Sequence, residues 1–98
     1  MVKRVIWTQT AVRHYRDIVF YYKNNDAQQA AIKFETAVFK KIERLMEHPF
    51  IGRPTRKFKT VRLIKVDDNR QMTYRMKGNT LFITNFWDTR RDPNQRPF

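Results

Sequence analysis

Residues 59–87 read KTVRLIKVDDNRQMTYRMKGNTLFITNFW, and this stretch decides the fold. It contains three runs rich in β-branched, aromatic and other apolar residues, separated by two short polar segments. The runs are 59–66, 71–76 and 80–87, and the segments between them are Asp67-Asp68-Asn69 and Lys77-Gly78-Asn79. Asp, Asn and Gly favour tight turns, so both connections are expected to be hairpins that join three antiparallel strands.

The residues before this stretch predict one strand and two helices. Residues 2–7 form a short β-rich run, and Thr8 follows it at the position of a helix N-cap. Apolar residues at helical spacing then continue to Lys23. A second helix is expected from an Asp26 cap to His48, because the proline that comes next disfavours a helical conformation in the residue before it. Its apolar stripe consists of Ala30, Phe34, Val38, Ile42 and Leu45.

Together these elements predict an α+β fold with the order β-α-α-β-β-β. The turn between the two helices is short, so they should form an antiparallel hairpin. We expect this hairpin to pack on one face of a mostly antiparallel, four-stranded sheet. A chain of 98 residues predicts one domain over residues 1–98, with a loop at 49–58 and an irregular tail at 88–98.

The composition is strongly basic. Twenty-one Lys and Arg stand against nine Asp and Glu, a formal net charge of +12, which predicts attraction to polyanions or to an acidic partner. The chain has no cysteine, which excludes disulfide scaffolds and thiolate metal sites, and two histidines are too few for a multi-histidine metal centre. We expect no cofactor and no metal. With no apolar run near ~20 residues, we expect a soluble, cytoplasmic protein without a membrane partner.

The basic residues concentrate in the second half of the chain. From Arg53 to Lys65 there are six cations and no acid. Alternation along the strands predicts that Leu63 faces the core, while Arg62 and Arg75 share the exposed face of the sheet. Such a face suits nucleic-acid phosphates, although a merely solvated surface is the alternative. The expected nucleic-acid-binding residues are Arg53, Arg56, Lys57, Lys59, Lys65, Arg91 and Trp87, and Trp87 has burial in the core as its alternative.

RNA cleavage without a metal needs a general base, a general acid and cations that stabilise the phosphorane. The sequence is rich in cations, but its only candidate bases are His14, His48 and Glu47, each more simply explained as a structural or solvated side chain. No carboxylate cluster suggests a magnesium site. Phosphate-loop and nucleophile-elbow motifs are absent from the sequence.

Several short motifs, taken in order, resemble the RelE/ParE superfamily of bacterial toxins from type II toxin–antitoxin modules. They are Trp7-Thr8 followed by Ala11, Leu45…Pro49…Gly52-Arg53, Val61-Arg62, Tyr74-Arg75 and Trp87-Asp88-Thr89-Arg90…Asp92-Pro93. The resemblance covers about the whole chain. It implies a small fold with a helical hairpin against an antiparallel sheet, and a cognate antitoxin that wraps the toxin and blocks it.

The resemblance implies two alternative targets. RelE-like members cut mRNA in the ribosomal A site with basic side chains on the sheet and, commonly, a C-terminal tyrosine or histidine, whereas ParE-like members poison DNA gyrase. For a ribonuclease, the matching positions are Arg62 and Arg90 or Arg91, and Arg75 would join them on the sheet. Gln71 replaces an expected arginine, and no Tyr or His follows Trp87. A non-toxic nucleic-acid-binding module that uses the same basic face is the alternative from another functional class.

Overall fold

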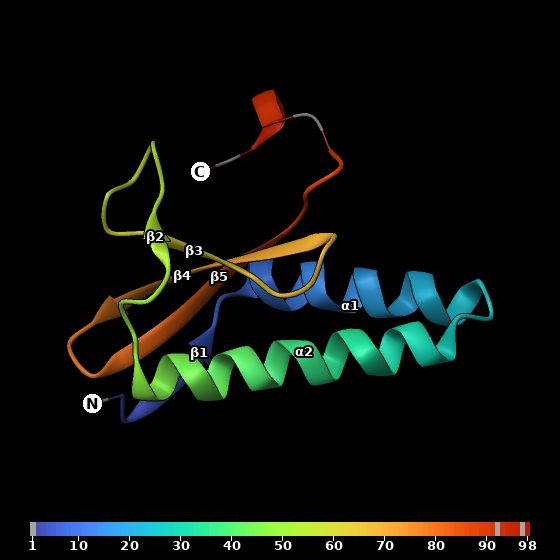
Figure 1. Cartoon of the computed structure of the whole chain (residues 1–98), viewed down its shortest axis with the longest axis horizontal. Coiled ribbons are helices and arrows are strands. Elements are labelled where there is room, and N and C mark those ends of the chain that lie inside the picture. Colours follow the sequence, from blue (N-terminus) through green and yellow to red (C-terminus); the bar gives the residue numbers. More distant parts are fainter. Residues whose placement is uncertain (1, 92, 97) are drawn as a thin grey trace.

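Two helices cover one face of a five-stranded sheet (Figure 1). The computed structural model describes residues 2–91, 93–96 and 98. The elements in chain order are β1 (Arg4–Trp7), α1 (Gln9–Asn24), α2 (Gln28–Glu47), β2 (Arg53–Pro54), β3 (Arg62–Lys65), β4 (Arg70–Lys77), β5 (Thr80–Asp88) and the 3-10 turn η1 (Pro93–Gln95). The strand order is β1-β5-β4-β3-β2; β1 runs parallel to β5, and the other pairs are antiparallel. Over the described residues, neither helix has the length and apolarity needed to cross a membrane.

The α+β architecture is confirmed, with one strand more than the sequence predicted. β2 lies inside the segment expected to be a loop and pairs only Arg53 with Leu63 and Pro54 with Arg62. A proline is tolerated there because β2 is an edge strand, where one backbone N–H is not needed for a ladder. Two residues are too few for a recognisable sequence pattern.

The ends of the helices follow local chemistry, with one exception. The Thr8 hydroxyl accepts from the Ala11 N–H at 3.1 Å and donates to the Thr84 carbonyl at 3.1 Å, so the predicted cap also ties α1 to β5. α2 ends at Glu47 as predicted, and the His48 N–H donates to the Arg44 carbonyl. The expected Asp26 cap is wrong. Asp26 has φ 54°, a left-handed turn conformation, so the helix begins after Ala27 without a side-chain cap.

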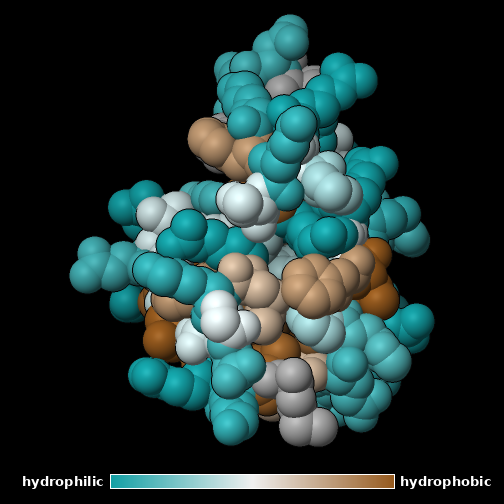
Figure 2. Space-filling view, turned by 90° about the vertical axis from the view of Figure 1, so that its left-hand side faces the viewer, coloured by the Kyte–Doolittle hydropathy of each residue, from teal (hydrophilic) through white to brown (hydrophobic). Residues whose placement is uncertain are grey.

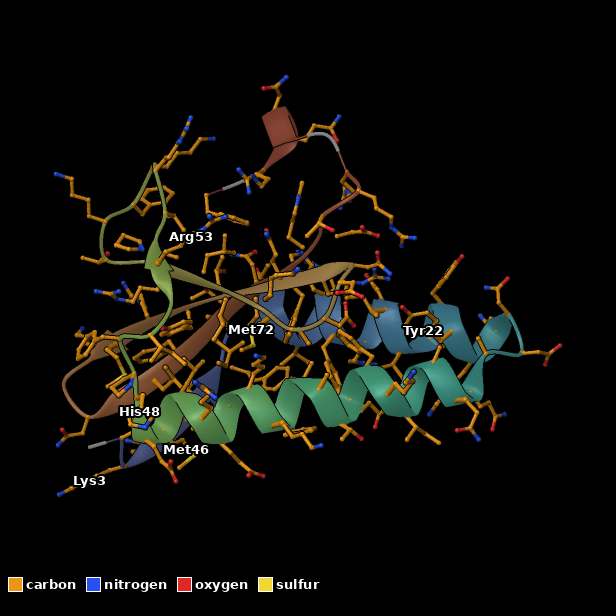
Figure 3. All side chains as sticks on the ribbon, in the orientation of Figure 1. Lys3, Tyr22, Met46, His48, Arg53 and Met72 are labelled. Carbon is orange, nitrogen blue, oxygen red and sulfur yellow. The ribbon has the colours of Figure 1, made fainter. Side chains whose placement is uncertain are left out.

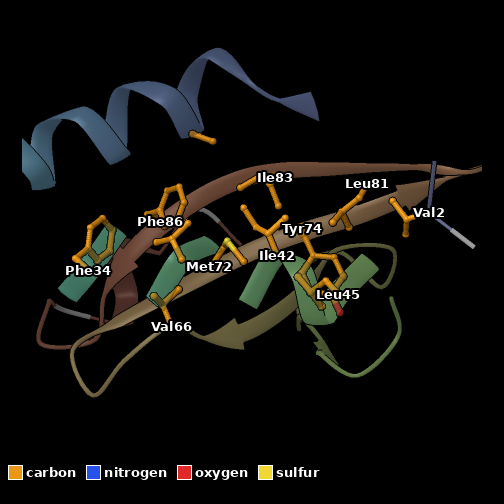
Figure 4. Close-up of a cluster of buried hydrophobic side chains, with 12 residues drawn as sticks. Val2, Phe34, Ile42, Leu45, Val66, Met72, Tyr74, Leu81, Ile83 and Phe86 are labelled. Carbon is orange, nitrogen blue, oxygen red and sulfur yellow. The ribbon is translucent and has the colours of Figure 1, made fainter. Parts of the chain in front are cut away.

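The main core lies between the helices and the sheet (Figure 4). From α2 the core receives Ala31, Phe34, Val38, Ile42 and Leu45, which confirms the predicted stripe except at its first residue. Met72, Tyr74, Leu81 and Ile83 face them from β4 and β5 and are fully buried. Burial of this apolar surface is the dominant favourable term in the folding of the chain.

The register of β3 corrects the predicted orientation of its side chains. Arg62 pairs with Tyr74, and Leu63 pairs with Thr73. Paired residues lie on the same face, so Arg62 lies on the helix side of the sheet with the buried Tyr74, whereas Leu63 lies on the opposite, outer face. The expectation that Arg62 and Arg75 share the exposed face is therefore wrong. Leu63 is buried nevertheless, because a second small cluster of Leu63, Trp87 and Phe98 covers that part of the outer face.

Arg62 holds the loop that leads into β2. Its Nη1 donates to the Phe50 carbonyl at 3.1 Å and the Gly52 carbonyl at 2.6 Å, and its guanidinium lies 5.2 Å from the centre of the Phe50 ring. The Gly52 N–H donates to the Tyr74 hydroxyl at 2.9 Å. A Cβ at Gly52 would lie 2.6 Å from that hydroxyl and 2.9 Å from the Leu63 carbonyl, so only glycine fits.

We therefore expect Arg62→Ala to reduce stability, by about 2 kcal/mol, because it removes charge-assisted hydrogen bonds to two backbone carbonyls. Arg75→Ala is the matched control. Arg75 is exposed and contacts the Phe82 ring at 5.5 Å, so its loss should change the free energy of unfolding by less than about 1 kcal/mol. Urea denaturation of both variants measures the difference. Equal losses would show that the loop contacts of Arg62 contribute nothing to stability.

Candidate anion-binding cleft

The outer face of the sheet carries cations and no acids. Strand pairing and alternation place five basic side chains there, and all are exposed: Arg4, Arg53, Lys65, Arg75 and Lys77. Within the described strands, no Asp or Glu shares this face. The only acidic strand residue, Asp88, pairs with Arg70 and lies on the helix side. The predicted basic sheet face therefore exists, although Arg62 is not part of it.

At one end of this face, the β2–β3 loop and the C-terminal tail enclose a cleft of about 530 Å³. Both segments lie on the far side of the sheet from the helices (Figure 1). The lining residues are Arg53, Pro54, Thr55, Arg56, Lys57, Leu63, Asn94, Arg96 and Phe98. Four of these described lining residues are cations and none of them is acidic. In Figure 2, the surface at the top of the view is mostly hydrophilic. In Figure 3, Arg53 lies on the opposite side of the sheet from Met72 and α2.

Thr55 holds the loop side of the cleft together through three hydrogen bonds. The Thr55 hydroxyl donates to the Phe58 carbonyl at 2.7 Å and accepts from the Phe58 N–H at 3.3 Å. The Thr55 N–H also donates to the Val61 carbonyl at 2.8 Å. These bonds pair backbone groups of Thr55, Phe58 and Val61 within the loop, and the side chain of Arg56 is left exposed to solvent or a ligand.

The tail side depends on one terminal aromatic ring. Phe98 is 7% exposed and packs edge-on against Trp87, with 6.1 Å between the ring centres. The Arg96 guanidinium lies 5.4 Å from the Phe98 ring, and Lys57 Nζ donates to the Arg96 carbonyl at 3.2 Å. Sequence reasoning missed Arg96 because the tail was expected to be irregular. The aromatic residue at position 98, in an otherwise polar segment, was the available signal that the tail is anchored.

The structure places the other predicted binding residues at different locations. Lys65 lies on the outer face, as does Arg75, which was predicted as catalytic, and Lys59 is exposed outside the cleft. Trp87 is 6% exposed, because Phe98 packs against its ring and the Arg91 guanidinium lies 4.6 Å from the ring centre. The ring is therefore not accessible for the predicted stacking on a base. Burial, the alternative for Trp87, is confirmed. Asp92 lies outside the described residues.

None of the candidate bases lines the cleft. His14 is partly buried between α1 and β5, where its Nδ1 accepts from the Phe86 N–H at 3.3 Å. Burial lowers the pKa of His14, and the positive charge of Arg13 adds to this effect. Glu47 and His48 lie at the end of α2 and are exposed. The described lining residues of the cleft can bind an anion, but no carboxylate, imidazole or phenol among them can accept a proton.

Arg90, predicted as catalytic, belongs to a separate ion-pair network. Asp88 accepts from Arg90 Nη2 at 2.9 Å and from Arg70 Nη1 at 3.1 Å. The hydrogen bonds from Arg90, together with the charge of Arg70, hold the pKa of Asp88 at about 2 although burial opposes the shift. The charge of Arg90 is thus paired with Asp88, and Arg90 does not line the cleft.

The Asp88 network predicts acid-sensitive stability. A carboxylate with a lowered pKa stabilises the fold above its unfolded pKa, and this contribution disappears as the pH falls through about 4 to about 2. We expect a loss of about 1 kcal/mol, less than the full shift implies because the Arg90 side chain is exposed to solvent. Thermal unfolding of the wild type and Asp88→Asn between pH 5 and 2 measures it. Parallel pH profiles for the two proteins would show that ionised Asp88 does not contribute to the stability of the fold.

One protein family matches the sequence of the chain, and several solved structures match its fold. The sequence profile of the family described as "ParE toxin of type II toxin-antitoxin system, parDE" matches residues 5–93. No curated protein sequence matches the chain. Three similar solved structures show the same fold at low sequence identity.

The first is the chromosomal ParDE toxin–antitoxin system from P. aeruginosa, with 20% identity, a TM-score of 0.73, and 90% of this chain and 96% of that chain covered. The YoeB/ParE toxin from Agrobacterium tumefaciens has 15% identity, a TM-score of 0.66 and coverage of 88% and 98%. YafQ from E. coli strain BL21(DE3) has 10% identity, a TM-score of 0.55 and coverage of 91% and 94%.

Proposed function

The chain belongs to the ParE toxin family of type II toxin–antitoxin systems, and from this premise we propose that it inhibits growth by binding DNA gyrase through the basic cleft. The chain is thus a toxin of a toxin–antitoxin system. Gyrase is the target that the ParE-like resemblance implies. A gyrase–DNA complex is polyanionic, so a face with five exposed strand cations is suited to encounter it.

One observation favours binding over RNA cleavage. The cleft joins Arg53, Arg56, Lys57 and Arg96 without any general acid or base among its described lining residues. Cations alone stabilise a phosphate, whereas cleavage also requires proton transfer from the 2′-hydroxyl and to the leaving oxygen. His14, the only partly buried histidine, lies on the helix side and lines a different pocket.

Two assays on the purified chain test the proposal. We expect inhibition of supercoiling by DNA gyrase, and intact message when the chain is added to programmed ribosomes. Cuts in A-site mRNA would replace the proposal with a ribonuclease mechanism. If neither reaction is affected and cells that express the chain alone grow normally, the alternative of a non-toxic nucleic-acid-binding module is supported instead.

A cognate antitoxin is the partner that the family implies, and the helices offer a surface for it. Ile32, Phe39 and Met46 recur every seven residues along one side of α2, and each is exposed. Phe20 on α1 is 65% exposed. We infer that an antitoxin covers these apolar side chains, because a group of exposed apolar side chains is typical of a protein–protein interface. We expect this antitoxin to be acidic, because the chain has a net charge of +12. Co-expression with the product of the adjacent open reading frame should restore growth and protect α2 from hydrogen exchange.

A further inference from the structure

A second, smaller pocket lies where α1 meets the end of β5. It measures about 170 Å³, and its lining residues are His14, Asp17, Ile18, Arg70, Phe86, Asp88 and Arg91. None of these described residues also lines the basic cleft. We propose that this pocket binds a phosphate group, with Arg91 and His14 as donors and Arg70 as the buried cation behind them. The proposal does not depend on the gyrase assignment.

The acid at the base of the pocket is already neutralised. Asp88 Oδ1 accepts from the Arg90 backbone N–H at 2.8 Å and from Arg90 Nε at 3.1 Å. Its Oδ2 accepts from Arg90 Nη2 and from Arg70 Nη1. Two guanidinium groups therefore share one carboxylate, so the network keeps a surplus positive charge, and Asp88 has little remaining capacity to compete with an incoming anion.

Arg70 retains an unused donor in this network. Its side chain is 6% exposed, its Nη2 donates to the Tyr22 hydroxyl at 3.4 Å, and its guanidinium lies 5.8 Å from the Tyr22 ring. The Nε of Arg70 is buried and has no hydrogen-bond partner. A buried donor without a partner is unfavourable, and Arg70 lines the pocket, so an oxyanion that reached this donor would form the hydrogen bond that the described fold leaves unmade.

His14 presents a donor rather than a charge. Because its Nδ1 accepts from the Phe86 N–H, the proton of the neutral ring is on Nε2, the other ring nitrogen. Burial, Arg13 and Arg91 lower the pKa of His14, and Asp17 opposes them, which favours this neutral form at pH 7. A neutral imidazole with a fixed Nε2–H can donate to a phosphate oxygen without needing to be charged.

Arg91 completes the set of donors. Its guanidinium carbon lies over the Trp87 ring, 4.6 Å from the ring centre, and in the described part of the chain the guanidinium has no hydrogen bond or ion pair. An arginine guanidinium can make two parallel hydrogen bonds to phosphate oxygens, and Arg91 keeps its donors available for them. Asp17 is the one acid in the described lining whose charge is not paired, so the lining itself holds two arginines and two aspartates. Arg90, which pairs with Asp88 from outside the lining, brings the local total to three cations and two acids, a surplus of one positive charge. Asp17 therefore limits the affinity for an anion.

Nitrogen-resolved NMR of the full chain tests the proposal with inorganic phosphate as the probe. We expect saturable shifts of the His14 ring and Arg91 Nε signals, beyond those produced by chloride at equal ionic strength. Arg91→Gln should weaken phosphate binding at this site by about tenfold, the loss of one bidentate charged contact. Arg13→Gln is the control, because it also removes one positive charge next to His14 but Arg13 does not line the pocket. It should change the affinity for phosphate by less than about threefold.

The source of the phosphate is resolved by a second titration. A dinucleotide with a 5′-phosphate is compared with the same dinucleotide that ends in a 5′-hydroxyl. Saturation by the phosphorylated form at lower concentration than inorganic phosphate identifies a nucleic-acid end, and equal or weaker saturation identifies the free anion. If none of these probes shifts the His14 and Arg91 signals saturably, or if Arg13→Gln is as damaging as Arg91→Gln, the pocket is not a phosphate site.

Discussion

We expect Phe34→Ala to lower the free energy of unfolding by about 3–5 kcal/mol, the usual cost of truncating a buried aromatic residue. Phe34 is 1% exposed and lies on the α2 stripe. Its ring centre is 5.6 Å from that of Tyr15 on α1 and 6.0 Å from that of Phe86 on β5, so one side chain joins both helices to the sheet. Small domains have total stabilities of about 5–15 kcal/mol, so the variant should lose a large share of its stability.

The matched control for this prediction is Phe20→Ala. The same atoms are removed from a helix, but the Phe20 side chain is 65% exposed and leaves no cavity. Its effect should stay below about 1 kcal/mol. Chemical denaturation of both variants measures the two losses in the free energy of unfolding, with thermal unfolding as a second measurement. Similar losses for the two variants would mean that the helical hairpin is not anchored on the sheet through Phe34.

The helices and strand boundaries could be predicted because their signals are local. The Thr8 cap, the apolar spacing of α2 and the stop before Pro49 each depend on a few neighbouring residues. The two turns between the last three strands are equally local, and these strands begin and end within three residues of their predicted positions. Asp26 is the exception, since a residue suited to capping is equally suited to the left-handed turn that it occupies.

The orientation of β3 could not be predicted, because both faces of the sheet bury apolar residues there. Leu63 and Ile64 are adjacent, and alternation alone does not say which of them faces the helices. Leu63 can be buried on the outer face because it packs in one cluster with Phe98, which is about 35 residues away in the sequence. No residue near β3 signals this contact. A one-residue change in parity moves every side chain of a strand to the other face, so Arg62 moved with it.

The loop side of the cleft was predicted from its composition, and the tail side was not. Arg53, Arg56 and Lys57 are consecutive or nearly so, and their lack of acidic neighbours is visible in the sequence. Arg96 joins them only through the long-range packing of Phe98 on Trp87. The same packing buries the Trp87 ring, so a single tertiary contact adds to the cleft a cation that the sequence did not predict and removes the candidate stacking residue.

We expect Arg53→Glu combined with Arg56→Glu to raise the concentration needed for half-inhibition of gyrase supercoiling by about 100-fold or more. Each lost charge-assisted contact contributes about 1.5 kcal/mol or more, and two such losses correspond to about two orders of magnitude in affinity. Both side chains are exposed and have no hydrogen bond or ion pair within the described structure, so thermal unfolding should be unchanged.

Lys33→Glu combined with Lys40→Glu is the control for net charge. Both lysines are exposed on α2, on the opposite side of the sheet from the cleft, and the double variant changes the net charge by the same amount. If inhibition depended on overall charge alone, the two double variants would lose activity equally, and more salt would weaken the wild type to the same extent. A selective loss in the Arg53 and Arg56 variant is the result expected of a localised binding site. Full inhibition by that variant would show that the cleft does not contact the target.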